Sequence, residues 1–455
     1  MKKLIVLVIL LFFVRSAGAQ TIINRDAEIK KMVDEISKDN IEKSVRKLVS
    51  FHTRHNLSEQ NNPEKGIGAA WNWIKAEIEK NVPRSGGRLE VKFEEYTVGG
   101  QGQRIAQETK LKNVVATLKG TGPDDDRIII ISAHLDSRAA SDNDAAGFAP
   151  GADDDASGVA AIIELVRIMS VKEFPATIIF MAVSGEEHGL YGARFMAEKA
   201  KQEKWNIVAM LNNDMIGNSR SGETLLNDNM RVRVFSEGVP ALETEQMAAA
   251  RKYTSGENDS RARQLARYIK ETGERYVDQL NVTLVFRNDR FGRGGDHTPF
   301  SQAGFPAVRI CEFNEDYSHQ HKIPSLVNGV QTGDLPEFVD FEYVRKNAGI
   351  NLAVIASLAM APYEPANCGI VTSQGNSTTL RWQEPLKGIK PSGYFILIRE
   401  TYQPLWEKKI SVKGTEITLP YSKDNYFFGI QSVDAAGHES IAVFPGQARR
   451  TSGAN

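Results

Sequence analysis

Residues 127–137 read Arg-Ile-Ile-Ile-Ile-Ser-Ala-His-Leu-Asp-Ser. The four consecutive isoleucines are apolar on both faces of an extended chain, which is typical of a central strand covered by helices on both sides. His134 and Asp136 follow at the end of this strand, and side chains two positions apart on an extended segment point the same way. The stretch therefore predicts a buried sheet with polar side chains gathered at one edge.

The segments around this strand alternate between helical and strand patterns. Apolar residues at helical spacing predict helices, over 66–82, 158–169, 191–201 and 338–359. Strand patterns are found at 89–96, 112–119, 177–183, 207–212 and 307–312. This alternation predicts an α/β fold with a mostly parallel central sheet sandwiched by helices. The polar stretch 238–274 predicts an insertion outside the core.

The texture of the chain changes after residue 361. A proline-containing linker at 361–365 is followed by short strand patterns at 378–382, 393–399, 416–419 and 426–433. This spacing predicts a small all-β sandwich over 366–450, and its strands resemble those of a fibronectin type III domain. The segment contains no cluster of titratable residues, so we expect a spacer or adhesion module that contacts other proteins or surfaces.

The N-terminus has the pattern of an export signal. Lys2 and Lys3 precede an apolar run of about 11 residues, and small residues at 17–19 form a cleavage pattern. Because a membrane span needs about 20 apolar residues, we expect no stable membrane insertion. The sequence therefore predicts a signal peptide over 1–19, a main domain over 20–361, and a periplasmic or secreted protein.

The composition excludes several classes of protein. The chain has 455 residues, 41% of them hydrophobic and 25% charged, which is typical of folded globular domains. Because 56 basic residues balance 57 acidic ones, no basic surface for nucleic acid is indicated. The two cysteines, Cys311 and Cys368, cannot form a disulfide framework and are expected to be separate.

Histidine, aspartate and glutamate concentrate in five segments near predicted strand ends. The carboxyl ends of strands in α/β sheets are where ligands bind, so these segments are expected to converge. Three adjacent carboxylates in one segment would repel one another, and a bound divalent cation is the simplest way to compensate this repulsion. Imidazole with carboxylate suits zinc. The five segments are 134–136, 151–158, 184–189, 212–215 and 317–321.

Other catalytic arrangements are absent from the sequence. The chain has no Gly-x-Ser-x-Gly nucleophile motif and no His-Glu-x-x-His pair, which excludes the hydrolases built on those motifs. Neither cysteine has an activating histidine nearby in sequence.

In order and spacing, the five segments resemble the co-catalytic di-zinc metallopeptidases typified by secreted bacterial leucyl aminopeptidases. Glutamate carboxypeptidase and glutaminyl cyclase are relatives with the same fold. The resemblance covers roughly residues 41–361 and implies two Zn²⁺ ions. It implies metal ligands at five positions, His134, Asp154, Glu187, Asp214 and a late histidine.

The resemblance also implies roles for residues beside the ligands. Asp136 would orient the ring of His134, and Asp155 would take part in the strained peptide bond found in relatives. Glu186 would be the general base that takes a proton from a hydroxide-forming water between the metals. The Asp296-His297 pair would lie close to the site without binding zinc.

The late histidine can be either His319 or His321. His319 with the following glutamine matches the local pattern of the family, so we predict His319 as the ligand. The family often places an aspartate four residues later, where this chain has Ile323. His321 therefore stays an alternative.

The sequence thus predicts an exported zinc aminopeptidase that hydrolyses the N-terminal bond of peptide substrates. The alternatives are a glutaminyl cyclase, a carboxypeptidase or dipeptidase of the same fold, or a non-catalytic binding protein that uses the β-sandwich.

Overall fold

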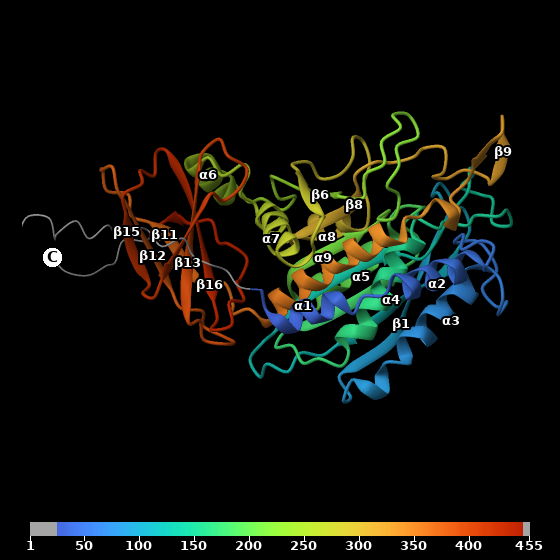
Figure 1. Ribbon diagram of the computed structural model, residues 1–455. Helices are drawn as coiled ribbons and strands as arrows, with labels where there is room; N and C mark the ends of the chain where they lie inside the picture. The colour runs from blue at the N-terminus through green and yellow to red at the C-terminus, as the bar shows by residue number, and fades with distance from the viewer. Residues whose placement is uncertain (1–24, 449–455) are drawn as a thin grey trace, which may run out of the picture.

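The computed structural model describes residues 25–448, so the predicted signal peptide lies outside the described residues (Figure 1). An eight-stranded sheet forms the centre, with the strand order β1-β2-β4-β3-β5-β8-β6-β7. Four of its seven strand pairs are parallel, namely β4–β3, β3–β5, β5–β8 and β6–β7. The strands are β1 (Leu89–Val98), β2 (Thr109–Leu118), β3 (Arg127–His134), β4 (Thr177–Val183), β5 (Asn206–Asn213), β6 (Arg231–Ser236), β7 (Asn281–Val285) and β8 (Ala307–Glu312).

Helices cover both faces of this sheet, as the isoleucine run predicts. Ile129 and Ile131 of β3 pack into the core formed with α4 and α9, whereas Ile130 packs on the opposite face with α5 and α8. Each fully buried side chain of this size contributes about 1.5–3 kcal/mol relative to exposure. The helices are α1 (Ala27–Asp34), α2 (Lys38–Val49), α3 (Gly66–Glu79), α4 (Ala156–Met169), α5 (Tyr191–Gln202), α6 (Glu245–Thr254), α7 (Arg261–Tyr276), α8 (His297–Ala303) and α9 (Phe341–Met360), with short 3₁₀ turns at Val82–Arg84 and Pro336–Phe338.

The predicted insertion at 238–274 is only partly outside the core. Helix α6 has no buried residue, but α7 buries Leu265, Ala266 and Ile269 in the main core. The prediction of an exposed segment was wrong because α7 carries many charged residues. Two of these, Arg263 and Arg267, are themselves buried. The neighbouring strands β6 and β7 were missed as well, and they extend the central sheet.

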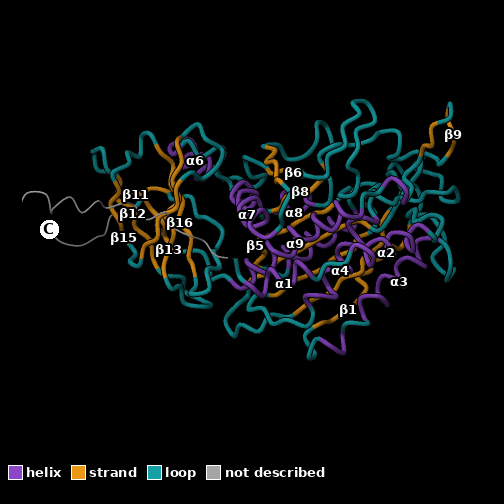
Figure 2. The backbone as a smooth tube through the Cα atoms, in the orientation of Figure 1, coloured by secondary structure: helices purple, strands orange, loops and turns teal. Residues whose placement is uncertain are grey.

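The C-terminal part consists of strands, as expected (Figure 2). Two sheets, with strand orders β15-β12-β11-β17 and β14-β13-β16, share one core that contains Trp382, Ile396 and Phe428. We call these two sheets the C-terminal sandwich. Its strands are β11 (Ala366–Ile370), β12 (Thr378–Gln383), β13 (Gly393–Glu400), β14 (Lys408–Val412), β15 (Glu416–Leu419), β16 (Tyr426–Val433) and β17 (Gly446–Gln447).

Cys311 is buried in the α/β part and Cys368 lies in β11, and both are free, as predicted. In the described part of the chain, no helix combines the length and apolar character that a membrane span requires.

Buried ion pairs join the C-terminal sandwich to the α/β part. Arg399 of β13 binds Asp259, which precedes α7, with 2.6 Å between Nη2 and Oδ2, and both side chains are almost fully buried. Asp259 also pairs with Arg267 of α7 at 3.3 Å. A second cluster joins Arg275 of α7 to Glu439 at 2.9 Å. Because charges at these depths are stable only when paired, the interface fixes the sandwich on the α7 side of the molecule.

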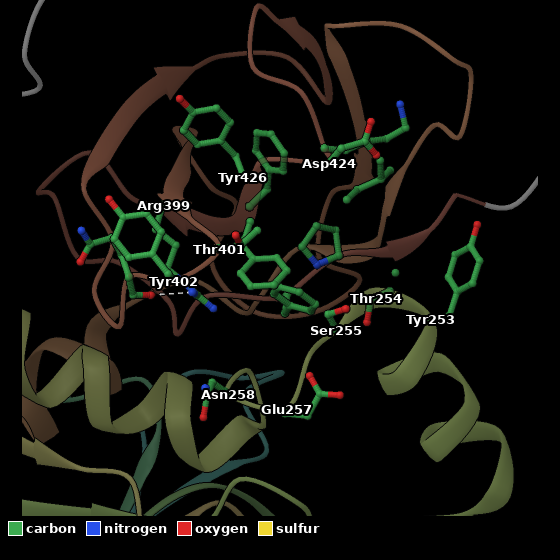
Figure 3. A pocket seen from close by; sticks show the side chains of 18 of the residues that line it. Tyr253, Thr254, Ser255, Glu257, Asn258, Arg399, Thr401, Tyr402, Asp424 and Tyr426 are labelled. Carbon is green, nitrogen blue, oxygen red and sulfur yellow. Dashed lines mark hydrogen bonds between the residues drawn. The ribbon is translucent and has the colours of Figure 1, made fainter.

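A cavity of about 950 Å³ lies beside this interface (Figure 3). Its walls come from the end of α6 with Tyr253, from the loop with Asn258, and from Tyr402 and Tyr426 of the C-terminal sandwich. None of the predicted zinc-site residues lines it, so the cavity is separate from the predicted chemistry.

We expect Arg399→Ala to lower the free energy of unfolding by about 3–5 kcal/mol, because the substitution leaves the buried Asp259 carboxylate with less compensation. The matched control is Arg381→Ala. Arg381 pairs with Glu416 at the exposed surface of the same sandwich, where the loss should be much smaller because solvent screens the pair. Urea unfolding followed by tryptophan fluorescence measures both. Equal losses in the two variants would contradict the structural role assigned to Arg399.

Candidate metal centre

The order of the strands brings three predicted ligands to one edge of the sheet. Strands β4, β3 and β5 are parallel neighbours. His134 is the last residue of β3, Asp214 follows β5, and Glu187 follows β4. Asp154 lies just before α4, whose N-terminus is at the same edge. The convergence expected from the sequence is therefore present.

Two groups of side chains meet at Asp154. In the first group, Nε2 of His134 lies 3.0 Å from Oδ1 of Asp154 and 3.8 Å from Oδ1 of Asp214. In the second, Nε2 of His321 lies 3.0 Å from Oδ2 of Asp154 and 2.9 Å from Oε1 of Glu187. The ligand atoms within each group all lie within 4.8 Å of one another. Asp154 thus offers one oxygen to each group.

His319, the predicted late ligand, does not reach this centre, and His321 takes the place instead. The His319 ring stacks on Phe338, with 3.8 Å between centroids, and its nearest ion-pair partner is Asp316 at 3.7 Å. The segment turns here, and His321 has a left-handed backbone with φ of 53°. The local turn therefore separates two histidines that a motif comparison could not distinguish.

Asp136 contacts His134 in a different way from that predicted. Nδ1 of His134 lies 3.0 Å from the backbone oxygen of Asp136, whereas the carboxylate is 3.8 Å away. That carboxylate accepts hydrogen bonds from Asn56 and from the backbone N–H of Glu187. Asp136 therefore fixes the ring through its carbonyl and fixes the Glu187 loop through its side chain.

Glu186 lies beside both groups without belonging to either. Burial raises the pKa of Glu186 well above its usual range, and the nearby carboxylates of Asp214 and Glu187 raise it further. Glu186 is therefore an ionisable group next to the proposed ligands, which is the position that a general acid–base group requires.

The electrostatics of the two histidines fit a cation site. Burial alone would lower the pKa of His321, but the carboxylates of Glu187 and Asp154 outweigh burial and raise the pKa to about 10. The carboxylates of Asp154 and Asp214 likewise raise the pKa of His134. Within the described residues, the buried Nε2 of His134 also has no hydrogen-bond partner of good geometry. Clustered carboxylates with two such nitrogens form the donor set that zinc prefers.

Two arginines that the sequence analysis missed contact the proposed ligands. Arg309, fully buried on β8, binds Oδ1 of Asp214 at 2.7 Å, and Arg138 binds Oε2 of Glu187 at 2.9 Å. Arg138 could have been noticed, because it lies only two residues after Asp136. Arg309 sits inside an apolar strand pattern, and only the strand order shows that it faces Asp214.

Hydrogen bonds from distant segments hold the loop that carries Asp154. The carboxylate of Asp334 accepts the backbone N–H groups of Asp153 and Asp154, each at 2.8 Å. Arg54 donates to the carbonyls of Pro150 and Gly151 on the same loop.

Asp155 ties three segments of the centre together. Its carboxylate accepts from the backbone N–H groups of His134, Gly158 and Met215. The peptide bond between Asp154 and Asp155 is cis.

The Asp296-His297 pair lies near the centre, since Asp296 interacts electrostatically with His134 and Asp214. Asp296 is buried, and burial together with nearby carboxylates raises its pKa to about 8. His297 is also buried, and its Nε2 lies 2.8 Å from the backbone oxygen of Asn288.

Comparison with known proteins agrees with this geometry. The model of peptidase family M28 matches residues 113–323. A probable zinc metalloprotease of the fungus Leptosphaeria maculans is 44% identical over 92% of this chain and 97% of its own length. The chain belongs to peptidase family M28. A second probable zinc metalloprotease, from Pyrenophora tritici-repentis, is 41% identical over 92% of this chain and 98% of its own.

Solved structures agree on the fold. The LapA aminopeptidase of Legionella pneumophila is similar with a TM-score of 0.53 at 19% identity, covering 76% of this M28 chain and 77% of its own. LapB from the same organism is similar with a TM-score of 0.52 at 19% identity, covering 74% of this chain and 76% of its own. The M28 chain is therefore a zinc metallopeptidase with the expected α/β fold.

We expect His321→Ala to lower the zinc content of the purified protein, because it removes a nitrogen that faces both Asp154 and Glu187. His319→Ala is the matched control, since it removes a histidine two residues away that faces Phe338. Metal analysis after dialysis measures both variants. Zinc loss in His319→Ala alone would contradict the assignment of His321.

Proposed function

We propose that this M28 peptidase is an exported aminopeptidase that uses two zinc ions to release N-terminal residues from peptides. The observation that carries the proposal is the position of Asp154, whose two carboxylate oxygens face histidines of two separate groups. A carboxylate placed in this way can hold two cations side by side. The LapA aminopeptidase, which has the same fold, supports the proposal that hydrolysis takes place at the N-terminal end of the peptide.

Each zinc ion would have ligands from both imidazole and carboxylate. His134, Asp154 and Asp214 would hold one ion, and Asp154, Glu187 and His321 would hold the other. Bound zinc supplies a water molecule with a pKa lowered toward about 7 and polarises the carbonyl of the scissile bond.

Glu186 would carry the proton during hydrolysis. The side chain lies at the same loop as Glu187, outside both metal groups, so its carboxylate is free to accept a proton from the attacking water. The same carboxyl group would then donate that proton to the leaving amine. Asp136 holds the backbone N–H groups of Glu186 and Glu187, which positions both side chains.

The proposed export and the proposed type of the C-terminal domain rest on sequence patterns. The basic and apolar N-terminus supports export to the periplasm or beyond, and the C-terminal strands support a fibronectin type III-like sandwich. The alternatives, a glutaminyl cyclase, a carboxypeptidase or dipeptidase, and a non-catalytic binding protein, are not favoured. A glutaminyl cyclase requires one zinc, whereas two groups of metal-donor side chains are present. A non-catalytic binding protein does not need Glu186.

The direct test is hydrolysis of leucyl p-nitroanilide by the zinc-loaded protein. We expect turnover that a chelator abolishes and added zinc restores, because bound zinc would supply the positive charge that polarises the carbonyl of the scissile bond. The control substrate is N-acetyl-leucyl p-nitroanilide, whose blocked amine should prevent turnover. Equal turnover of both substrates would contradict the aminopeptidase assignment.

We expect Glu186→Gln and Glu187→Gln to differ although the residues are neighbours. Glu186→Gln removes only a proton carrier, so kcat should fall by about 10²–10⁴ while zinc stays bound and KM changes little. Glu187→Gln weakens a proposed ligand and should lower zinc occupancy. Steady-state kinetics and metal analysis measure both variants. If Glu186→Gln loses activity only in proportion to lost zinc, Glu186 is not the base.

A further inference from the structure

A small β-hairpin projects from the molecule at the end opposite the C-terminal sandwich (Figure 1). Its strands are β9 (Ser325–Val327) and β10 (Val330–Thr332), and Val327 pairs with Val330 next to the turn. Asn328 and Gly329 form the turn, with φ values of 51° and 81°. Positive φ at both central residues is the type I′ geometry that matches the twist of a tight hairpin. The turn chemistry thus specifies this hairpin locally.

Both ends of the hairpin are connected to residues that belong to the metal centre or hold its loops. His321, proposed as a ligand, lies four residues before β9. Asp334, which holds the Asp154 loop through two backbone N–H groups, lies two residues after β10. The strands therefore stand at the rim of the centre, and their position is fixed by residues that the centre itself requires.

The hairpin exposes apolar side chains on both of its faces. Leu326 is 71% exposed, Val330 is 61% exposed and Val327 is 50% exposed. Since Val327 and Val330 are direct cross-strand partners, they share one face, and Leu326 lies on the other. A two-stranded hairpin is marginally stable alone in water, so exposed apolar residues at this place are costly without a function.

Another loop next to the metal centre also exposes an apolar side chain. Leu225, in the loop that follows β5 and Asp214, is 99% exposed. That loop packs against the His321 segment, because a Cβ atom at Gly222 would lie 2.6 Å from Oδ1 of Asp316. Exposed apolar side chains therefore belong to two segments that each also supply a proposed ligand.

We propose that the hairpin binds the peptide substrate beyond the scissile bond and favours apolar residues there. The inference rests on the proposed function and adds a substrate class to it, namely peptides whose second to fifth residues are apolar. A peptide with its first bond at the metal centre must continue along the rim. Apolar side chains of the substrate would cover Val327 and Val330, which share one face of the hairpin, and this removes apolar area of both partners from water.

The test compares three substrates of the zinc-loaded enzyme. One is leucyl p-nitroanilide, which is too short to reach the hairpin, and the others are pentapeptides that begin with leucine and continue with either valines or serines. We expect Val327→Ser/Val330→Ser to lower kcat/KM for the valine peptide about tenfold, consistent with the loss of about one buried aliphatic contact. The other two substrates should change less than twofold. Leu386→Ser is the matched control, because Leu386 is 93% exposed in the C-terminal sandwich.

Loss of kcat/KM on all three substrates, or on none, overturns the proposal. A change confined to the oligomeric state, measured by light scattering, also overturns it and makes the hairpin a self-association surface. If the wild-type enzyme hydrolyses none of the substrates, the proposed function fails separately. Binding of the fluorescently labelled valine peptide then decides the inference, since weaker binding to the double variant supports it and equal binding overturns it.

Discussion

The metal centre depends on one carboxylate, that of Asp154, keeping its two oxygens directed at two histidines. His134 comes from a central strand and His321 from a turn almost 190 residues later, so no local structure could align them. The structure meets this constraint by attaching the Asp154 loop to several distant segments. Asp334 and Arg54 bind its backbone, and Asp155 connects it to the ends of β3 and β5.

The balance of charge in the centre follows from the same constraint. Asp154 is shared between two groups, and each of the other two carboxylates, those of Asp214 and Glu187, forms an ion pair with an arginine. Arg309 binds Asp214 deep in the sheet, and Arg138 binds Glu187 nearer the surface. Buried carboxylates cost much less free energy when such partners are present, so the acidic cluster can persist through folding before any cation binds. Each arginine also fixes the orientation of the carboxylate that it contacts.

Most of the fold could be predicted because its signals are local. The isoleucines of β3 are apolar on both faces, and the helical periods at α3, α4 and α5 are clear, so these elements and the sheet edge were predicted. The helical character of 238–274 was predicted, but the burial of helix α7 was not, because its buried arginines hide the apolar period. Asp259, the partner of Arg267, can be identified only from the folded chain. The choice between His319 and His321 failed for a related reason. The turn that separates them is fixed by contacts with Phe338, Asp154 and Glu187, none of which is local in sequence.

The buried ion pair between Arg399 and Asp259 fixes the orientation of the C-terminal sandwich relative to the α/β part. The C-terminal sandwich is attached on the α7 side, whereas the hairpin that follows His321 lies at the other end (Figure 1). Two parts joined by desolvated charges keep one relative orientation, unlike domains that meet through a small polar contact. Any surface or partner bound by the outer strands of the sandwich would therefore lie at the end of the molecule opposite the hairpin. The sandwich would then determine the direction in which the proposed metal centre faces relative to that partner.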